Sequence, residues 1–387
     1  MIKVAIICEF NPFHNGHKLL FERVRENFAP KQVCIVCIMS GNFVQRGTLA
    51  LISKYKRSEF AVDCGADIVI ELPYPWSASY AQSFARAGVS IAENLGGIDY
   101  LAFGSESFDE NYIVDCAEKI TDETFESELS RMLADNKNTA KSYAELRCEV
   151  FEKMYGRELS RRPNDILAIE YVSALKLLKS SIKPLFIKRY NDFSATESRK
   201  YISLGDDNSL KSFIPEEIYE KILSAPKFSA LLPDEACLLF LAYSDAEKLS
   251  ESPEMSYDLA SRLINASKSG RYRNLTDLLD AVATKKYTDA RIRRALNFAF
   301  LGVKRSDLLC KPGYSLVLAS STNGRNVLRE FAKSSKIPLL SAKSAHNKLS
   351  GIPAKQYEIS EKADFAYSFC GEFTENEGIK PYIKQSI

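Results

Sequence analysis

A recurring order of helical stretch, glycine and short apolar run constrains the fold of this chain most strongly. Residues 58–64 and 90–95 have helical patterns, and each stretch ends at a glycine before the next apolar run. The runs have the length and β-branched content of buried parallel strands, and they lie at residues 2–8, 33–39, 68–70 and 100–103. Helix, glycine cap, turn and buried strand are the parts of a right-handed βαβ crossover. We therefore predict a Rossmann-like, doubly wound α/β domain that binds ligands at the C-terminal ends of its parallel strands.

The patterns divide the chain into three predicted domains. Residues 1–205 form the Rossmann-like domain. In residues 206–306 the strand patterns fade and apolar residues recur at helical spacing, which predicts a helical region. Residues 307–387 form a small C-terminal α/β unit, with the predicted order strand 315–318, helix 326–332 and strand 337–340.

Composition and charge narrow the class of protein. The 387 residues are 45% hydrophobic and carry a formal net charge of only +2, so any nucleic-acid surface must be local. The apolar run at residues 2–8 is too short for a secretory signal, and no stretch reaches the ~18 apolar residues that a membrane span needs. We therefore expect a cytoplasmic enzyme with no membrane partner.

The nine cysteines are typical of reduced, buried thiols, because they stand singly in apolar runs. Cys34 and Cys37 form a CxxC pair, but they lie in a predicted strand, where residues three apart point to opposite faces. The chain has only three histidines, and no second pair has zinc spacing. We interpret the cysteines as core residues and predict no protein-held metal.

The segment after the first predicted strand has the features of a phosphate site. It contains His14, Gly16 and His17 and leads directly into a helix. A helix N-terminus presents unpaired N–H groups to an anion, and a glycine lets a ligand approach the backbone. Two imidazoles three residues apart can reach one side of the first turn and stabilise charge on a leaving pyrophosphate. The alternative is that the histidines only cap the helix or lie on the surface.

Several motifs in order extend this pattern into a family resemblance. EFNPFHNGH begins at residue 9, and the others are MSGNFVQRG (39–47), GADIVIELP (65–73), FGSE (103–106), RPNDILAIEY (162–171) and IKR (187–189). Together they resemble the tRNA(Met) cytidine acetate ligases of the HIGH-type nucleotidyltransferase superfamily. The resemblance implies a ligase that uses ATP and acetate to form acetyl-adenylate. The acetyl group then passes to N4 of the wobble cytidine (C34) of elongator tRNA(Met), and AMP and diphosphate are released.

The resemblance also implies specific ATP contacts. His14 and His17 are the implied catalytic residues, at the phosphates. The implied ATP-binding stretch is Ile7, Cys8, Glu9, Phe10, Asn11, Pro12, Phe13, His14, Asn15, Gly16, His17, Lys18, Leu19 and Leu20. Gly104, Asn164 and Arg189 are further implied contacts, although Gly104 could be a simple strand-end turn and Asn164 a helix N-cap.

Ser194, Thr196 and Arg199 resemble the second superfamily signature, which binds phosphate; they are also compatible with a capped helix start. The segment between Arg189 and Ser194 is shorter than is usual in the family, so the resemblance implies no specific contacts from that loop. The loop at 40–47 should face the same crevice, where Gln45 and Arg46 could orient a carboxylate or a nucleotide. ATP chemistry usually brings Mg²⁺, but no Mg²⁺ ligand can be named from the sequence.

A local basic region predicts where RNA binds. Residues 268–305 contain ten Lys and Arg against three Asp, and Tyr272 and Tyr287 lie among them as possible stacking platforms. We expect Lys54, Lys56 and Arg57 to extend this region towards the crevice. The predicted RNA-binding residues are Arg271, Arg273, Lys285, Lys286, Arg291, Arg293 and Arg294. The alternative is a solvated helical face.

Two other functions compete with the acetate ligase. An adenylyltransferase acting on a small phosphate-bearing metabolite would explain the HxGH site but not the basic region. A non-catalytic RNA-binding protein with a vestigial nucleotide site would explain the basic region, but both nucleotide signatures are intact. The oligomeric state cannot be inferred from these patterns.

Overall fold

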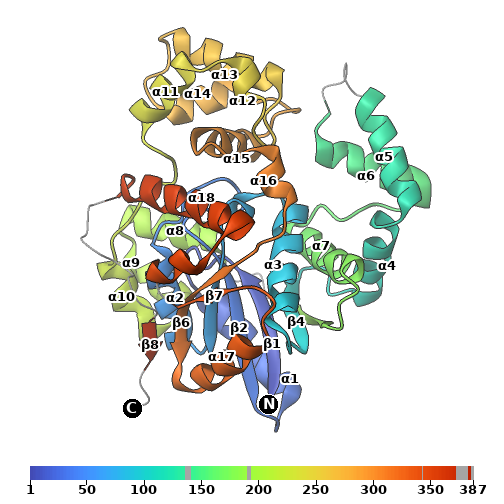
Figure 1. Cartoon of the computed structure of the whole chain (residues 1–387), viewed down its shortest axis with the longest axis vertical. Coiled ribbons are helices and arrows are strands. Elements are labelled where there is room, and N and C mark those ends of the chain that lie inside the picture. Colours follow the sequence, from blue (N-terminus) through green and yellow to red (C-terminus); the bar gives the residue numbers. More distant parts are fainter. Residues whose placement is uncertain (136–140, 190–192, 342, 372–381, 385–387) are drawn as a thin grey trace.

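The computed structural model of the chain describes residues 1–135, 141–189, 193–341, 343–371 and 382–384. An eight-stranded sheet lies at its centre, in the order β5-β4-β1-β2-β3-β6-β7, with β8 also paired to β6 (Figure 1). The strands are β1 (Ile2–Cys8), β2 (Val33–Ser40), β3 (Ile68–Leu72), β4 (Tyr100–Ser105), β5 (Lys183–Lys188), β6 (Ser315–Ser321), β7 (Leu339–Leu340) and β8 (Tyr382–Lys384).

The first five strands are parallel and wind outwards in two directions from β1. β1 pairs with β2 along its whole length, from Ile2 opposite Val33 to Cys8 opposite Met39, and it pairs with β4 on its other side. The order β5-β4-β1-β2-β3 reverses direction between β1 and β4, so the carboxyl ends of these two strands form the topological switch point where such sheets bind ligands. The predicted doubly wound α/β fold is confirmed.

Alternating side chains of the buried strands supply two cores, one on each face of the sheet. Ala5 and Ile7 belong to one core and Val4 and Ile6 to the other, as the two-residue period of a strand requires. The first core is covered mainly by α3 (Ala81–Leu95), α4 (Glu110–Ile120), α7 (Pro163–Leu177) and α17 (Thr322–Ser334). The second is covered mainly by α1 (Asn15–Phe28), α2 (Lys54–Asp63), α9 (Asp207–Phe213) and α10 (Tyr219–Ser224), with α8 (Ala195–Leu204) beside them.

The predicted core role of the Cys34 and Cys37 pair is confirmed by its placement, whereas Cys148, Cys310 and Cys370 are half-buried. Cys34 lies in the first core and Cys37 in the second, so the CxxC pair points to opposite faces of β2. All nine cysteines are free thiols. Burial raises the pKa of Cys34 to about 12, which keeps that thiol protonated and unreactive.

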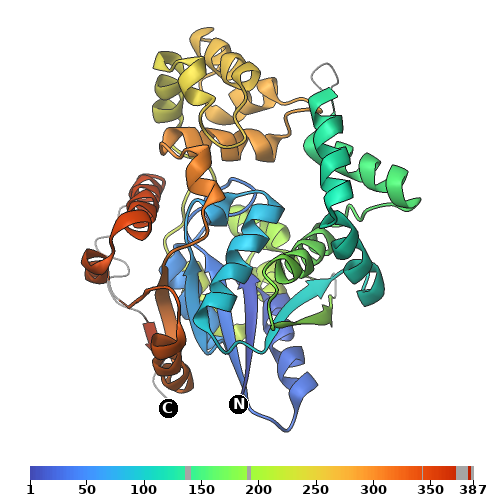
Figure 2. The same ribbon diagram turned by 45° about the vertical axis from the view of Figure 1, so that its right-hand side comes forward.

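The helical region stands above the sheet and has its own core (Figures 1 and 2). It contains α11 (Asp234–Tyr243), α12 (Ala246–Leu249), α13 (Tyr257–Lys268), α14 (Leu275–Val282), α15 (Asp289–Phe300) and α16 (Arg305–Leu309). Leu275, Leu278, Leu279 and Val282 of α14 form a buried stripe at helical spacing. Phe43, from the loop after β2, is buried in this same core, so the loop ties the helical region to the sheet.

A helical hairpin of α5 (Glu123–Asp135) and α6 (Tyr143–Tyr155) projects on the other side of the molecule (Figure 2). Short 3₁₀ helices occur at η1 (Trp76–Ala78), η3 (Glu216–Ile218) and η4 (Lys343–Lys348). In the described part of the chain, no helix combines the length and the apolar character that crossing a membrane requires.

The C-terminal segment joins the main sheet. β6 runs antiparallel to β3, with Ile68 opposite Ser320, so the predicted small α/β unit extends the existing sheet by adding strands to its edge. The predicted strand at 337–340 is shorter in the structure and begins at Leu339. The long helix α18 (Gly351–Ser368) then crosses back beside α2 and the loop after β2 (Figure 1).

Candidate active site

The two histidines of the HxGH motif open helix α1 and stack on each other. Nδ1 of His14 accepts a hydrogen bond from the Gly16 N–H at 3.1 Å, and Nδ1 of His17 accepts one from the His14 N–H at 3.2 Å. The ring centroids are 3.7 Å apart. Since Nδ1 is an acceptor in both rings, each neutral imidazole carries its proton on Nε2. The histidines therefore do cap the helix, as the alternative interpretation held, but each keeps an Nε2–H donor for a ligand.

Both imidazoles are neutral at physiological pH. Burial, together with the charges of Arg189 and Arg199, lowers the pKa of His14 to about 3. Burial and the neighbouring His14 hold the pKa of His17 well below its usual value. The histidines thus act as hydrogen-bond donors without a full charge, and the positive charge of the site comes from the arginines.

A glycine is required at position 16 because of where the His14 ring lies. A Cβ at this position would lie 3.0 Å from Cε1 of His14 and 3.3 Å from the Cβ of Phe193. The sequence analysis interpreted Gly16 as a position where a ligand approaches the backbone. In the structure, the space left by the missing side chain lies next to the His14 ring. The glycine allows that ring to fold back over the helix N-terminus, which orients its Nε2 edge.

Two arginines from distant parts of the chain meet the histidines. Arg189 follows β5, its N–H donates to the Ser105 carbonyl at 3.2 Å, and its Cβ lies 3.7 Å from where a Cβ of Gly104 would be. Arg199, on α8, donates from Nη1 to the Asn11 carbonyl at 2.6 Å. The Arg199 bond to Asn11 joins the start of α8 to the segment after β1, and the charges of both arginines act on His14. The structure therefore brings the two predicted phosphate signatures together.

The start of α8 is a capped helix N-terminus. The Ser194 side chain accepts a hydrogen bond from the Glu197 N–H at 3.1 Å, and the Thr196 hydroxyl accepts one from Arg199 Nη2 at 3.2 Å. The residues of the predicted phosphate signature therefore also form the capped N-terminus of α8. The shortened segment before Ser194 includes residues 190–192, which lie outside the described part of the chain.

Asn164 is fixed by a residue that the sequence analysis did not identify. The Glu106 carboxylate accepts the Asn164 N–H at 3.1 Å and the side-chain Nδ2 at 2.7 Å. The N-cap of α7 is Arg162, so the N-cap interpretation of Asn164 is wrong. With Nδ2 engaged, the side chain offers its Oδ1 as an acceptor for a ligand donor. Asp165 ties the same loop together by accepting the Ser105 hydroxyl at 2.8 Å. The FGSE motif, with its glutamate, carried the signal that could have identified Glu106.

Much of the predicted ATP-binding stretch at residues 7–20 is packed inward. The side chains of Ile7, Phe10 and Phe13 are buried, so these residues can meet a ligand only through their backbone. The rings of Phe10 and Phe13 pack around His17, with centroids at 4.8 and 5.3 Å, and support it. Of the polar side chains, Asn15 donates to the Ser212 carbonyl at 2.9 Å. Glu9 is partly exposed.

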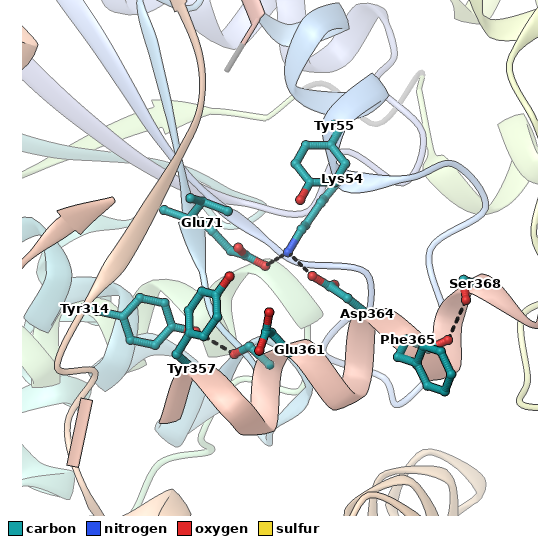
Figure 3. Close-up of a pocket in the computed structure, with 11 residues that line it drawn as sticks. Lys54, Tyr55, Glu71, Tyr314, Tyr357, Glu361, Asp364, Phe365 and Ser368 are labelled. Carbon is teal, nitrogen blue, oxygen red and sulfur yellow. Dashed lines mark hydrogen bonds and ion pairs between the residues drawn. The ribbon is translucent and has the colours of Figure 1, made fainter. Parts of the chain in front are cut away.

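Lys54 and Arg57 do not extend the basic surface, and that expectation is wrong. Lys54 Nζ is buried between Glu71 Oε1 and Asp364 Oδ2, each at 2.6 Å, beside a cavity of about 390 Å³ between the sheet and α18 (Figure 3). Arg57 is fully buried and donates to four backbone carbonyls, those of Glu9, Ser40, Gly41 and Ile52. Arg57 therefore holds the backbone at the ends of β1 and β2, and Lys54 joins β3 to α18, so neither cation is available to RNA.

The loop after β2 connects the nucleotide crevice to the basic helix α15. The Gln45 N–H donates to Glu9 Oε1 at 2.7 Å on one side of the loop. On the other side, Asn297 of α15 donates to the Gly47 carbonyl at 2.9 Å. Gly47 has a φ of +71°, and a Cβ there would lie 2.6 Å from the Arg294 backbone nitrogen. Only glycine therefore allows the loop and the helix to come this close.

The predicted RNA-binding residues differ in how available they are. Arg271, Arg273 and Lys285 are exposed in the loops that flank α14, and Lys286 is half-buried. On α15, Arg294 forms a bidentate pair with Glu254 at 2.6 and 2.7 Å, Arg291 donates to the Glu254 carbonyl, and Arg293 pairs with Asp289. Tyr287 is buried and cannot stack on a base, so that expectation is wrong, while Tyr272 is half-buried.

The comparisons with known proteins agree with this geometry. A model of the HIGH nucleotidyl transferase family matches residues 1–380. The tRNA(Met) cytidine acetate ligase of Caldanaerobacter subterraneus subsp. tengcongensis is 32% identical over 88% of each chain. That of Thermoanaerobacter pseudethanolicus is 30% identical over 98% of this chain and 99% of the relative. The chain belongs to the tRNA(Met) cytidine acetate ligase family of HIGH nucleotidyltransferases. The family resemblance inferred from the motifs is confirmed.

A solved member of this ligase family has the same fold. The crystal structure of Thermotoga maritima TmcAL bound with alpha-thio ATP superposes with a TM-score of 0.89 at 25% sequence identity, and the match covers 99% of both chains. Nearly the whole described fold, including the helical region and the C-terminal strands, is therefore shared with a protein that binds an ATP analogue. This agreement supports a nucleotide site in the present chain.

Proposed function

We propose that this chain is an ATP-dependent acetate ligase that makes acetyl-adenylate and transfers the acetyl group to N4 of C34 in elongator tRNA(Met). One observation carries the proposal: the stacked HxGH imidazoles, the capped start of α8 and two arginines converge at the switch point of a ligase-family fold. The cavity beside Lys54 is a less suitable nucleotide site, because Glu71, Glu361 and Asp364 give it an excess of negative charge.

The first step is adenylate formation. An acetate oxygen attacks the α-phosphorus of ATP, the new C(O)O–P bond forms, and the bond to the bridging oxygen of pyrophosphate breaks. Nucleotidyl transfer needs positioning and charge stabilisation more than a protein nucleophile. The Nε2–H groups of His14 and His17 are available for the leaving pyrophosphate, with the Arg189 and Arg199 guanidinium groups close by. Neutral donors suit this role, because they do not hold pyrophosphate as tightly as imidazolium would.

Asn164 is available to position the nucleoside of ATP. Its free Oδ1 accepts hydrogen bonds, so it suits a hydroxyl or an exocyclic amine of the nucleoside. The backbone at Gly104, beside Arg189, is open to close approach, since among the described residues outside its chain neighbours only the Arg189 Cβ comes within 4 Å of a Cβ built there. These two positions lie on the β4 and α7 side of the crevice.

The tRNA approaches from the helical region. Arg271, Arg273 and Lys285 supply exposed positive charge, and α15 contacts the loop that borders the crevice. A phosphate backbone on these residues would bring an unpaired anticodon base towards the end of β1. The arginines of α15 are less available to RNA, because Arg291 and Arg294 are bonded to Glu254 and Arg293 is paired with Asp289.

Mg²⁺ would enter with the triphosphate. Within the described residues, no group of three or more His, Cys, Asp or Glu side chains could hold a metal ion.

Isotope exchange tests the proposal directly. Acetate-dependent exchange of labelled pyrophosphate into ATP, followed by mass analysis of tRNA nucleosides, should show adenylate formation and N4-acetylcytidine. Exchange that requires a phosphorylated metabolite instead of acetate would support the adenylyltransferase alternative. The absence of any exchange, with tRNA binding retained, would support the non-catalytic alternative.

A further inference from the structure

Glu9 stands out because it places a carboxylate in a site built for anions. It is the first residue after β1 and precedes the HxGH turn by a few positions. Its Oε1 accepts the Gln45 N–H at 2.7 Å, and its backbone carbonyl accepts a hydrogen bond from the buried Arg57. Among the residues that the structure describes, none donates a hydrogen bond to Oε2. The residue is partly exposed, and the bond from Gln45 fixes the orientation of its carboxylate.

The charged and titratable groups around Glu9 come from several elements. Arg46 from the loop after β2, Arg57 from α2 and Arg199 from α8 favour the carboxylate form. Cys8 of β1 and Tyr171 of α7 also interact with it. Burial outweighs the three arginines and raises the pKa of Glu9 above its ordinary value. A carboxylate of this kind accepts a proton more readily than an exposed one.

A negative group here does not suit the other ligands of the site. ATP, acetate and pyrophosphate are anions, and a carboxylate next to them costs binding energy unless it has a separate task. The substrate that presents N–H donors is the acceptor nucleoside. Carboxylates read the exocyclic amine of cytosine through its N–H groups.

We propose that Glu9 binds the N4 amine of the acceptor cytidine and takes its proton during acetyl transfer, an inference that rests on the proposed function. The amine nitrogen attacks the carbonyl carbon of acetyl-adenylate and the N4–C bond forms. The C–O bond to the phosphate breaks, and AMP leaves with that electron pair. The N4 proton passes to Glu9 Oε2 and from there to solvent. No further reactant is needed, and the same contact rejects bases that lack an amine at this position.

The test separates transfer from adenylate formation. Acetate-dependent pyrophosphate exchange and single-turnover transfer from preformed acetyl-adenylate to tRNA would be measured for the wild type, Glu9→Gln and Glu9→Asp. An amide still accepts the Gln45 N–H, so Glu9→Gln should lower the transfer rate ~10²-fold or more, the range of a lost general base, and lower exchange far less. Glu9→Asp, which keeps a carboxylate, should recover part of the transfer rate and serves if Glu9→Gln fails to fold. Glu59→Gln, a change of the same kind on α2 outside the site, should behave as wild type.

The pH profile distinguishes a proton acceptor from a structural residue. The wild-type transfer rate should rise with pH through the pKa of Glu9 and then level off, whereas Glu9→Gln should lack this limb. Equal losses in exchange and transfer, or a normal transfer rate in Glu9→Gln, would overturn the inference. If the wild type itself shows no acetate-dependent exchange, the proposed function fails; if only the Glu9 variants behave unexpectedly, the fault lies with the role of Glu9.

Discussion

The buried triad of Lys54, Glu71 and Asp364 makes the sharpest stability prediction. The exposed fractions of the three side chains are 2%, 4% and 23%, and Lys54 Nζ touches both carboxylates at 2.6 Å (Figure 3). Burial opposes the charged form of Lys54, but Asp364 and Glu71 outweigh burial and keep its pKa well above the ordinary value. Lys54→Met would remove the cation and leave Glu71 as a buried carboxylate without its partner.

The expected loss is large because one partner of a buried ion pair is removed. Such changes commonly lower the free energy of unfolding by ~3–5 kcal/mol. With an m-value of about 3 kcal/mol/M, the midpoint of urea unfolding should fall by about 1–1.7 M at pH 7.5. The loss should shrink as the pH is lowered to 5, because burial already raises the pKa of Glu71 and loss of Lys54 raises it further, so the carboxyl becomes protonated.

A double variant checks the cause. Lys54→Met with Glu71→Met removes the stranded charge, while the half-buried Asp364 keeps its hydrogen bond from Asn42 at 3.0 Å. This variant should regain at least half of the lost stability, since apolar side chains can replace a buried ion pair at little cost. Two results would contradict this explanation. Either the double variant is less stable than Lys54→Met, or Lys54→Met alone lowers the free energy of unfolding by less than about 1 kcal/mol.

Three further predictions concern the active site and the RNA surface. His14→Ala and His17→Ala should each raise the barrier to adenylate formation by ~3–4 kcal/mol in pyrophosphate exchange, as the loss of a preorganised donor does, and variants with normal exchange would contradict the assigned role. The pKa of His14 is about 3 in the folded chain and ~6.5 when unfolded, so the free energy of unfolding should fall as pH drops from about 6.5 towards 3. Urea titrations at a series of pH values should show a shallower fall for a His14→Gln variant. A fall parallel to that of the wild type would refute the burial of a neutral ring. Combined replacement of Arg271, Arg273 and Lys285 by Ala should weaken tRNA binding and reduce the salt slope by about 2–3, while exchange stays at the wild-type rate; an unchanged slope would place the RNA elsewhere.

The fold class and the position of the nucleotide site followed from local patterns. Buried strands, helix periods and glycine caps act over a few residues, so β1, α1 and their junction at His14 could be predicted without knowing what packs on them. The second phosphate signature at Ser194 was also readable, because a helix start is a local feature. Motif order was specific enough to identify the family.

Burial and pairing could not be predicted in the same way. The sequence treats Lys54, Arg57 and Tyr287 as available side chains, but Asp364, the carbonyls after β1 and β2, and the core of the helical region enclose them. Those partners lie up to 310 residues away along the chain, so nothing near Lys54 indicates them.

The sequence alone determined the doubly wound sheet, the helix start that carries two imidazoles, and the family. Only the tertiary structure decided that those imidazoles are neutral and share one tautomer, that Glu106 orients Asn164, and that Gln45 holds Glu9 with one oxygen free. The physical reason is that charge, protonation and hydrogen-bond geometry depend on desolvation and on neighbours brought together by packing, whereas secondary structure depends mainly on residues close in sequence.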